Sequence, residues 1–289
     1  MQSEISRLLK QRGHYVVQEG NDKDILLPAN EERPEVTESF KTILYSLMQR
    51  DEFRKSFRNW AFGQDFDENV NGQSVRNYVE LCERFGGWGS NEPGPRQKRY
   101  ASTFEWYISE LLRQQFAVRA SGFGLRLKDA HPDDEFDCVA LLDEGSVFVE
   151  CKTGQSELYK DVSKFNRRDA EISASCSLYL FDRDYTFQKT GEDSPKISRE
   201  RAMRLRILGV FEVSVGKHKF FEVCSVPNDG ETRFFLACSA FDGLEERIRY
   251  MIRYSGRGLN LRPADRPLYR RREIFCYGPD PMSIRRSGQ

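Results

Sequence analysis

The residues best suited to chemistry in this sequence are one aspartate, one glutamate and one lysine, carried by two neighbouring apolar runs. Asp137 lies in the run 136–142, and Glu150 and Lys152 lie at the end of the run 147–152. If the second run is a β-strand, its period of two places Glu150 and Lys152 on the same face. Two carboxylates that lie close together repel unless a proton or a cation lies between them. The three residues therefore predict either carboxylates shielded by Lys152 alone or half of a divalent metal site.

The segment that joins the two runs predicts a β-hairpin. It reads Asp143-Glu144-Gly145-Ser146, which contains turn-forming residues. A loop closed around 144–145, of two or of four residues, places Asp137 opposite Lys152 and diagonal to Glu150, so that all three side chains share one face. The alternative is a solvent-exposed cross-strand ion pair without a chemical role. Charged residues at the end of such an apolar strand disfavour this alternative, because they resist burial without a partner.

The arrangement resembles the PD-(D/E)XK nuclease superfamily, the restriction-endonuclease-like fold. In that family an Asp and an acid-x-Lys on the next strand hold one or two divalent ions, which implies that role for Asp137, Glu150 and Lys152. Next to the hairpin, the Pro-Asp pair of the family occurs upstream of the strand, as Pro132-Asp133, so we assign the ligand to Asp137 rather than to Asp133 or Asp134. Within the superfamily the two segments look most like the nuclease domains of CRISPR-associated effectors and Mrr-type restriction enzymes. Residues 1–95 are too short and too helical for the nucleotide-sensing domain of those effectors.

The resemblance also predicts the elements that position these residues, over about residues 100–215. The family places a helix before the hairpin, then a helix and a strand after the lysine. The matching segments are a helix start at 102–112, a helix at 157–172, a strand at 176–181, a helix at 199–208 and a strand at 209–215.

Glu105 has two interpretations. In the family the first helix often carries a further acid, and Glu105 has that place, which implies a catalytic role as a ligand or a supporting residue. Ser102-x-x-Glu105 is also a capping box, in which the glutamate only satisfies a backbone donor at a helix start. The sequence leaves both interpretations open.

The reaction that the resemblance implies is metal-dependent hydrolysis of a phosphodiester. Asp137, Glu150 and the backbone carbonyl of Cys151 would hold Mg²⁺ or Mn²⁺, because oxygen ligands suit hard cations. Lys152 would orient or help to deprotonate a water and stabilise the transition state. The expected substrate is nucleic acid, with DNA preferred over RNA, in defence or repair. The competing hypothesis is a non-catalytic module that binds nucleic acid or a protein on a nuclease-like fold.

Two basic segments are candidates for contacts with a phosphate backbone. Residues 244–289 carry 11 Lys and Arg against 5 Asp and Glu, whereas residues 1–95 carry 12 against 16. The alternatives are an ordinary solvated helix face and, after residue 279, a solvated tail. The candidate residues are Lys160, Lys164, Arg167 and Arg168 on the helix after the site, and Arg270, Arg271 and Arg272 near the C-terminus.

The whole pattern predicts an α/β protein with a restriction-endonuclease-like core, in which helices flank a mixed central sheet. A mainly helical N-terminal region, 1–95, precedes a nuclease domain, 96–289, that ends in a β-containing extension, with a linker at 86–95. Aromatic residues at helical spacing, such as Phe53 and Phe57, indicate a core rather than a base-stacking platform. The remaining predicted elements are helices at 3–11, 36–60, 74–85 and 244–254 and strands at 15–17, 25–27, 219–224 and 232–238.

Composition sets limits on the class of protein. The 289 residues include 45 Lys and Arg against 45 Asp and Glu, so net charge alone gives no sign of nucleic acid. There is no apolar run that resembles a signal peptide or that could span a bilayer, so we expect a soluble, cytoplasmic protein without a membrane partner. Seven cysteines without a C-x-x-C pair and three dispersed histidines disfavour a disulfide framework and a zinc site. A protein partner of the N-terminal region and a homodimer are left open.

Overall fold

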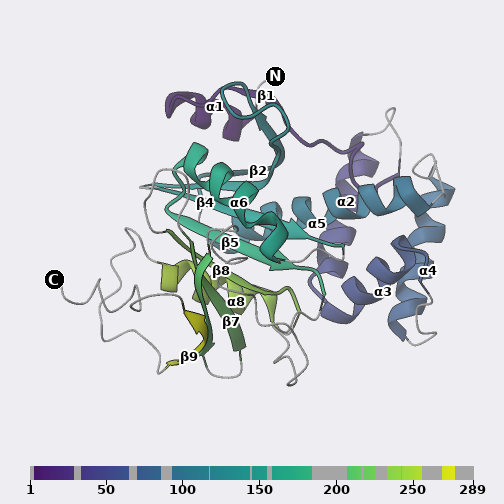
Figure 1. Cartoon of the computed structure of the whole chain (residues 1–289). Coiled ribbons are helices and arrows are strands. Elements are labelled where there is room, and N and C mark those ends of the chain that lie inside the picture. Colours follow the sequence, from purple (N-terminus) through teal and green to yellow (C-terminus); the bar gives the residue numbers. More distant parts are fainter. Residues whose placement is uncertain are drawn as a thin grey trace. The chain divides into compact units, whose positions relative to one another are not determined.

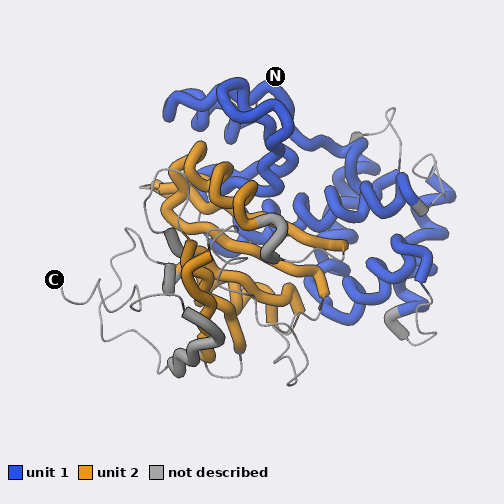
Figure 2. Tube along the Cα trace, viewed as in Figure 1, with its two compact units in different colours: residues 1–140 blue, residues 141–289 orange. Residues whose placement is uncertain are grey.

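A computed structural model describes most of the chain (Figure 1). The residues that it describes are 3–28, 34–64, 70–85, 93–116, 118–143, 145–154, 158–183, 207–215, 218–225, 233–241, 243–255 and 269–276. They belong to two compact units, residues 1–140 and 141–289 (Figure 2). The predicted domain boundary at residue 95 adjoins residues 86–92, which lie outside the described residues, and it stays a prediction. Within the described ranges, no helix is both long and apolar enough to cross a bilayer.

Unit 1 is mainly helical and has an aromatic core. Its elements are α1 (Glu4–Gln11), β1 (Val16–Gln18), α2 (Pro34–Met48), α3 (Asp51–Ala61), α4 (Val70–Arg84), α5 (Pro93–Gln115), β2 (Ala120–Leu127) and β3 (Phe136–Leu142), which extends past the unit boundary. Phe57 of α3 meets Tyr78 of α4 and Tyr100 of α5 edge to face, with ring centroids 5.7 and 5.6 Å apart. Phe53 and Phe57 are fully buried, so the prediction of a core at these aromatic residues is confirmed.

Two predictions for unit 1 are wrong in detail. The helix predicted over 36–60 is divided, because α2 ends at Met48 and α3 begins at Asp51. The segment 25–27, predicted as a strand, is buried without strand pairing. The N–H of Leu26 donates to Thr103 Oγ1 at 2.9 Å, and its carbonyl accepts from the Tyr78 hydroxyl at 2.8 Å. Side chains of two helices thus satisfy a backbone that a neighbouring strand would otherwise have to pair.

Unit 2 is built on a mixed β-sheet. Its described elements are β4 (Gly145–Lys152), α6 (Leu158–Ile172), β5 (Cys176–Phe181), β6 (Ile207–Val215), β7 (His218–Ser225), β8 (Arg233–Ser239), α8 (Leu244–Ser255) and β9 (Tyr269–Cys276). The strand order is β4-β5-β8-β7-β6-β9. The strands β4, β5 and β8 are parallel, and the remaining neighbours pair antiparallel. Parallel strands lie inside a sheet covered on both faces, which agrees with the nearly continuous apolar sequence of β4 and β5.

Helices cover both faces of this sheet. Phe165 of α6 stacks on Phe148 of β4, with centroids 5.2 Å apart, and lies 4.5 Å from the ring of Phe235 in β8. On α8, Arg247 hydrogen-bonds the thiol of Cys238, also in β8. Phe235 and Cys238 are three residues apart on one strand and so point to opposite faces. The predicted α/β class, with a mixed sheet flanked by helices, a helical N-terminal region and a β-containing C-terminal extension, is confirmed.

The C-terminal half differs from the prediction at two places. The helix predicted over 199–208 falls mostly on residues outside the described ranges, and its last two residues belong to β6. The strand β9, which pairs with β6, was not predicted.

Candidate active site

The strand β4 carries Glu150 and Lys152 at its carboxyl end. Its pairing with β5 sets Glu150 beside Tyr179 and Lys152 beside Phe181. The residues 147–149 favour a strand, because β-branched and aromatic side chains suit a pleated, buried surface. Nζ of Lys152 donates to Oε1 of Glu150 at 2.7 Å. The prediction that these two side chains share one face of a strand is therefore confirmed.

Glu150 is the centre of a buried ion network. Its second oxygen, Oε2, accepts a hydrogen bond from Nη1 of Arg168 at 2.6 Å. Only 2% of the Glu150 side chain and 4% of the Arg168 side chain are exposed, whereas 23% of the Lys152 side chain is exposed. The alternative of a solvent-exposed ion pair is therefore wrong for Glu150. Charge-assisted bonds to two cations offset the cost of taking this carboxylate out of water.

The helix α6 holds Arg168 over β4 through contacts on both sides of that residue. Three residues earlier, Phe165 stacks on Phe148. The next residue, Asp169, accepts a hydrogen bond from the hydroxyl of Ser177 in β5. Rotation of α6 about its axis would break both contacts, so the guanidinium is presented to Glu150 in a fixed position.

A further acid lies at the same edge of the sheet. Asp182 directly follows β5, and its N–H donates to the carbonyl of Lys152 at 2.9 Å. Asp182 is fully buried. At the same edge, Nζ of Lys152 lies 5.9 Å from the ring centroid of Tyr179. Ligands of α/β sheets commonly bind outside the carboxyl ends of the strands. The sequence reasoning missed Asp182, although an acid directly after the apolar run 176–181 was an available signal.

In unit 1, Asp137 and Glu105 both lie near the buried thiol of Cys138. Burial raises the pKa of this thiol, the negative charges of Glu105 and Asp137 raise it further, and a hydrogen bond with Ser109 opposes them. Asp137 lies in β3 and Glu105 in α5, and both side chains are partly exposed. Asp137 and Cys138 are adjacent on β3, so their side chains point to opposite faces of the strand, and the common effect on this thiol does not bring the two acids together.

The capping-box interpretation of Glu105 is wrong. The helix α5 begins at Pro93, so Ser102 and Glu105 lie well inside it, where the backbone N–H groups are paired within the helix. Ser109 follows Glu105 by four residues and therefore lies on the same helix face. Because Ser109 bonds the thiol of Cys138, Glu105 lies on the face of α5 that is directed toward β3.

The basic residues predicted to contact phosphate differ in placement along α6. Arg167 is exposed and Lys164 is partly exposed, whereas Arg168 is buried against Glu150. The side chain of Lys160 lies outside the described residues. The Arg168 side chain therefore points to a carboxylate of the protein itself, and phosphate contact by Lys164 and Arg167 stays a prediction.

The C-terminal arginines lie on a strand. Arg270, Arg271 and Arg272 belong to β9, in register with residues 214, 213 and 212 of β6. Their side chains lie outside the described residues, as does every residue after 276. Contact between these arginines and phosphate stays a prediction.

The predicted metal ligands fit a hard cation in kind. Carboxylate and carbonyl oxygens are the donors that Mg²⁺ and Mn²⁺ prefer, and Oε1 of Glu150 has a second lone pair besides the one that faces Lys152. Among the residues that the structure describes, no group of three or more His, Cys, Asp or Glu is arranged to hold a metal ion. The predicted ligand set has fewer than three such side chains, because it consists of the carboxylates of Asp137 and Glu150 and the backbone carbonyl of Cys151. Lys152 and Arg168 already hydrogen-bond the two oxygens of Glu150.

Comparisons with known proteins were made at the level of sequence and of structure. No protein-family model and no curated protein matches the sequence. Protein VC1899 from Vibrio cholerae has a similar structure, with a TM-score of 0.44 and 7% identity over 87% of this chain and 62% of its own. Can2 from Sulfobacillus thermosulfidooxidans, solved in complex with cyclic tetra-adenylate, has a TM-score of 0.37 and 14% identity over 70% of this chain and 55% of its own. Both likenesses are too weak to assign a fold or a function.

Proposed function

We propose that the protein is a nuclease that hydrolyses phosphodiester bonds with Mg²⁺ or Mn²⁺. The observation that supports this proposal best is the buried carboxylate of Glu150, with the partly exposed amine of Lys152 2.7 Å away on the same strand face. The acid-x-lysine pair of the PD-(D/E)XK family, which the sequence resembles, has this spacing. Nucleic acid is the proposed substrate, with DNA preferred over RNA, in defence or repair.

Each residue of the proposed site has a chemical role that is compatible with its position in the structure. Asp137, Glu150 and the carbonyl of Cys151 would hold the cation through oxygen. When bound, Mg²⁺ or Mn²⁺ supplies Lewis-acid chemistry that activates water and offsets charge on the phosphate. Nζ of Lys152 orients the attacking water and stabilises the transition state as a point charge. Lys152 is partly exposed and can reach a substrate, whereas the side chain of Glu150 is buried against the sheet.

The strand bounds lead to a prediction about Asp137. The strand β3 ends at Leu142 and β4 begins at Gly145, so the connection of two residues lies one position earlier than the sequence predicted. If the two strands form a hairpin across this connection, counting back from Leu142 and Gly145 pairs Asp137 with Glu150. Opposed carboxylates repel unless a proton or a cation lies between them, and we propose that Asp137 completes the site with a divalent cation.

A cleavage panel tests the proposal. Circular and linear DNA and RNA, single- and double-stranded, are incubated with Mn²⁺ or with EDTA. We expect cleavage in Mn²⁺ only, and we expect Glu150→Gln to slow it about 10²- to 10³-fold. The matched control is Glu245→Gln, which removes a partly exposed carboxylate of α8 that pairs with Arg249 at 2.7 Å; it should keep the wild-type rate. No cleavage of any substrate by the wild type would contradict the proposal.

A second candidate function is a module that binds nucleic acid without cutting it. The observation that favours it is that both oxygens of Glu150 accept hydrogen bonds from cations, so Glu150, Lys152 and Arg168 together carry one net positive charge, which suits phosphate. The melting temperature separates the two functions, because a cation that binds only the folded state must raise it. A rise in Mn²⁺ that EDTA reverses supports the nuclease. Nucleic-acid binding without such a rise supports the module.

A further inference from the structure

We propose that Arg168 is a positioning residue, which fixes Oε2 of Glu150 and so leaves Oε1 as the oxygen that receives the cation. This inference rests on the proposed function. It adds a residue that acts only through Glu150 and assigns different roles to the two oxygens of one carboxylate.

The two cations that contact Glu150 differ in their freedom to move. Lys152 has a flexible stem, lies at the end of β4 and is partly exposed, so its amine can leave Oε1 for solvent or substrate. Arg168 is almost fully excluded from water, with Nη1 2.6 Å from Oε2. A planar guanidinium also loses less freedom on hydrogen bonding than a lysine amine does. We therefore assign the exchangeable position to Oε1 and the permanent one to Oε2.

The surroundings of Arg168 explain why it stays in place. Phe165 is stacked on Phe148, and Asp169 is hydrogen-bonded to Ser177 of the neighbouring strand. These contacts tie α6 to both β4 and β5 within about one helical turn of Arg168. When Lys152 moves away, Glu150 retains one charge-assisted partner and cannot turn its carboxylate freely. A ligand that is held in advance binds its cation at a smaller cost in conformational entropy.

If Arg168 competes with the cation instead of positioning Glu150, its removal should change the affinity for the cation in the opposite direction. If Arg168 were only a competing positive charge, its removal would relieve repulsion of a divalent cation and tighten binding. If it positions Glu150, its removal weakens binding, as loss of a group that orients a metal ligand typically does by about 10- to 100-fold. The direction of the change therefore distinguishes positioning from competition.

The test is the dissociation constant of Mn²⁺, measured by electron paramagnetic resonance of free Mn²⁺ in the absence of substrate. We expect Arg168→Met to raise it about 10- to 100-fold and Arg168→Lys to recover part of the loss. The control Arg249→Met removes an arginine of the same unit that also pairs with a glutamate at 2.7 Å but is 40% exposed; it should leave the constant unchanged.

Other outcomes separate this inference from the proposed function. Wild type that binds Mn²⁺, with Arg168→Met binding it equally or more tightly, overturns the positioning role alone. Wild type that binds no Mn²⁺ overturns the proposed function together with the inference. If Arg168→Met does not fold by circular dichroism, Arg168→Gln decides, because its side chain is shorter than arginine and neutral, so it removes both the guanidinium contact and the positive charge. Mn²⁺ binding weaker than in the wild type then supports positioning, and equal or tighter binding overturns it.

Discussion

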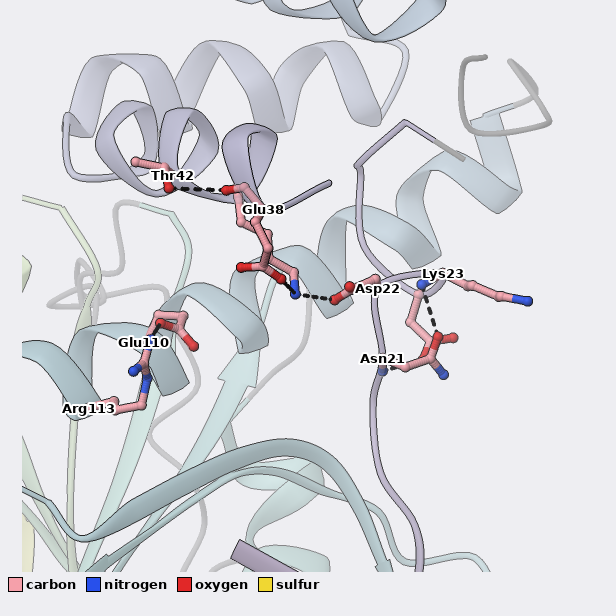
Figure 3. Close-up of polar contacts among 9 residues, drawn as sticks. Asn21, Asp22, Lys23, Glu38, Thr42, Glu110 and Arg113 are labelled. Atoms are coloured by element: carbon pink, nitrogen blue, oxygen red, sulfur yellow. Dashed lines mark hydrogen bonds and ion pairs between the residues drawn. The ribbon is translucent and has the colours of Figure 1, made fainter. Parts of the chain in front are cut away.

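Two sets of ion pairs in unit 1 and the ion network around Glu150 in unit 2 use the same chemical groups in different surroundings. In unit 1, Lys41 bridges Asp22 and Glu38 at 2.8 and 2.9 Å, and Arg113 pairs with Glu110 (Figure 3). These pairs keep partial contact with water, with 23% of the Lys41 side chain and 56% of the Arg113 side chain exposed. In unit 2, the carboxylate of Glu150 and the guanidinium of Arg168 are almost completely removed from water.

Exposed and buried ion pairs differ in how much they stabilise a fold. Exposed pairs contribute about 0–1 kcal/mol, since water and salt screen them. A buried pair has to overcome the desolvation of two ions, and well-packed apolar residues of similar size often serve stability as well or better. Stability alone therefore does not account for the network around Glu150, and this supports placing the chemistry of the protein there.

The largest expected effect is on the free energy of unfolding, when one ion pair in each region is broken. Arg168→Met leaves the Glu150 carboxylate buried with one partner fewer and should lower the free energy of unfolding by about 3–5 kcal/mol. Arg113→Met, in the exposed pair, should lower it by at most about 1 kcal/mol. Urea unfolding of both variants, followed by circular dichroism, measures the two changes. Equal losses would remove the distinction between the regions.

A smaller effect is expected when both members of the buried pair are replaced. Glu150→Met with Arg168→Met removes both charges, so the double variant should unfold with a free energy equal to that of the wild type or up to about 4 kcal/mol higher. The same variant should lose cleavage, because the proposed ligand is gone. A double variant that is as unstable as Arg168→Met would show that the pair is required for the fold.

The smallest expected effect concerns how the stability contributed by the ion pairs of Lys41 depends on pH. Burial lowers the pKa of Lys41, but hydrogen bonds to Asp22 and Glu38 outweigh it and raise the pKa overall. A raised pKa adds stability that is fully present below the unfolded lysine value of about 10.4 and is lost as the pH rises through the folded value. Lys41→Met should therefore cost less than about 1 kcal/mol at pH 7, and the cost should shrink above about pH 10.5. If urea titrations show the same loss of stability up to pH 11, the loss comes from packing of the alkyl stem of Lys41 and not from its charge.

Local patterns in the sequence predicted the elements around the site. The alternation of residues 147–152 predicted a strand with Glu150 and Lys152 on one face, and the structure confirms it. The helix α6 and the strand β5 lie close to the predicted ranges 157–172 and 176–181. These predictions succeeded because strand alternation and helical periodicity are set over a few neighbouring residues.

Long-range packing accounts for what the sequence did not predict. Arg168 was predicted to contact phosphate together with three other basic residues of its helix, whereas its burial against Glu150 depends on where Phe165 fixes α6 on the sheet. The segment 25–27 has a strand-like composition, but Thr103 and Tyr78, far away in sequence, take its backbone hydrogen bonds. The helix start predicted at Ser102 was wrong because the capping-box pattern can also occur inside a longer helix, here α5.

The most direct test of the central claim is the single-turnover rate of DNA cleavage by Lys152→Met at saturating Mn²⁺. The control Lys219→Met removes a mostly exposed lysine of β7 that lies 3.7 Å from Glu212. If Lys152 stabilises the transition state beside Glu150, its loss should slow cleavage about 10²- to 10³-fold, while the control cleaves like the wild type. A Lys152→Met protein that folds normally and cleaves at the wild-type rate would contradict the account.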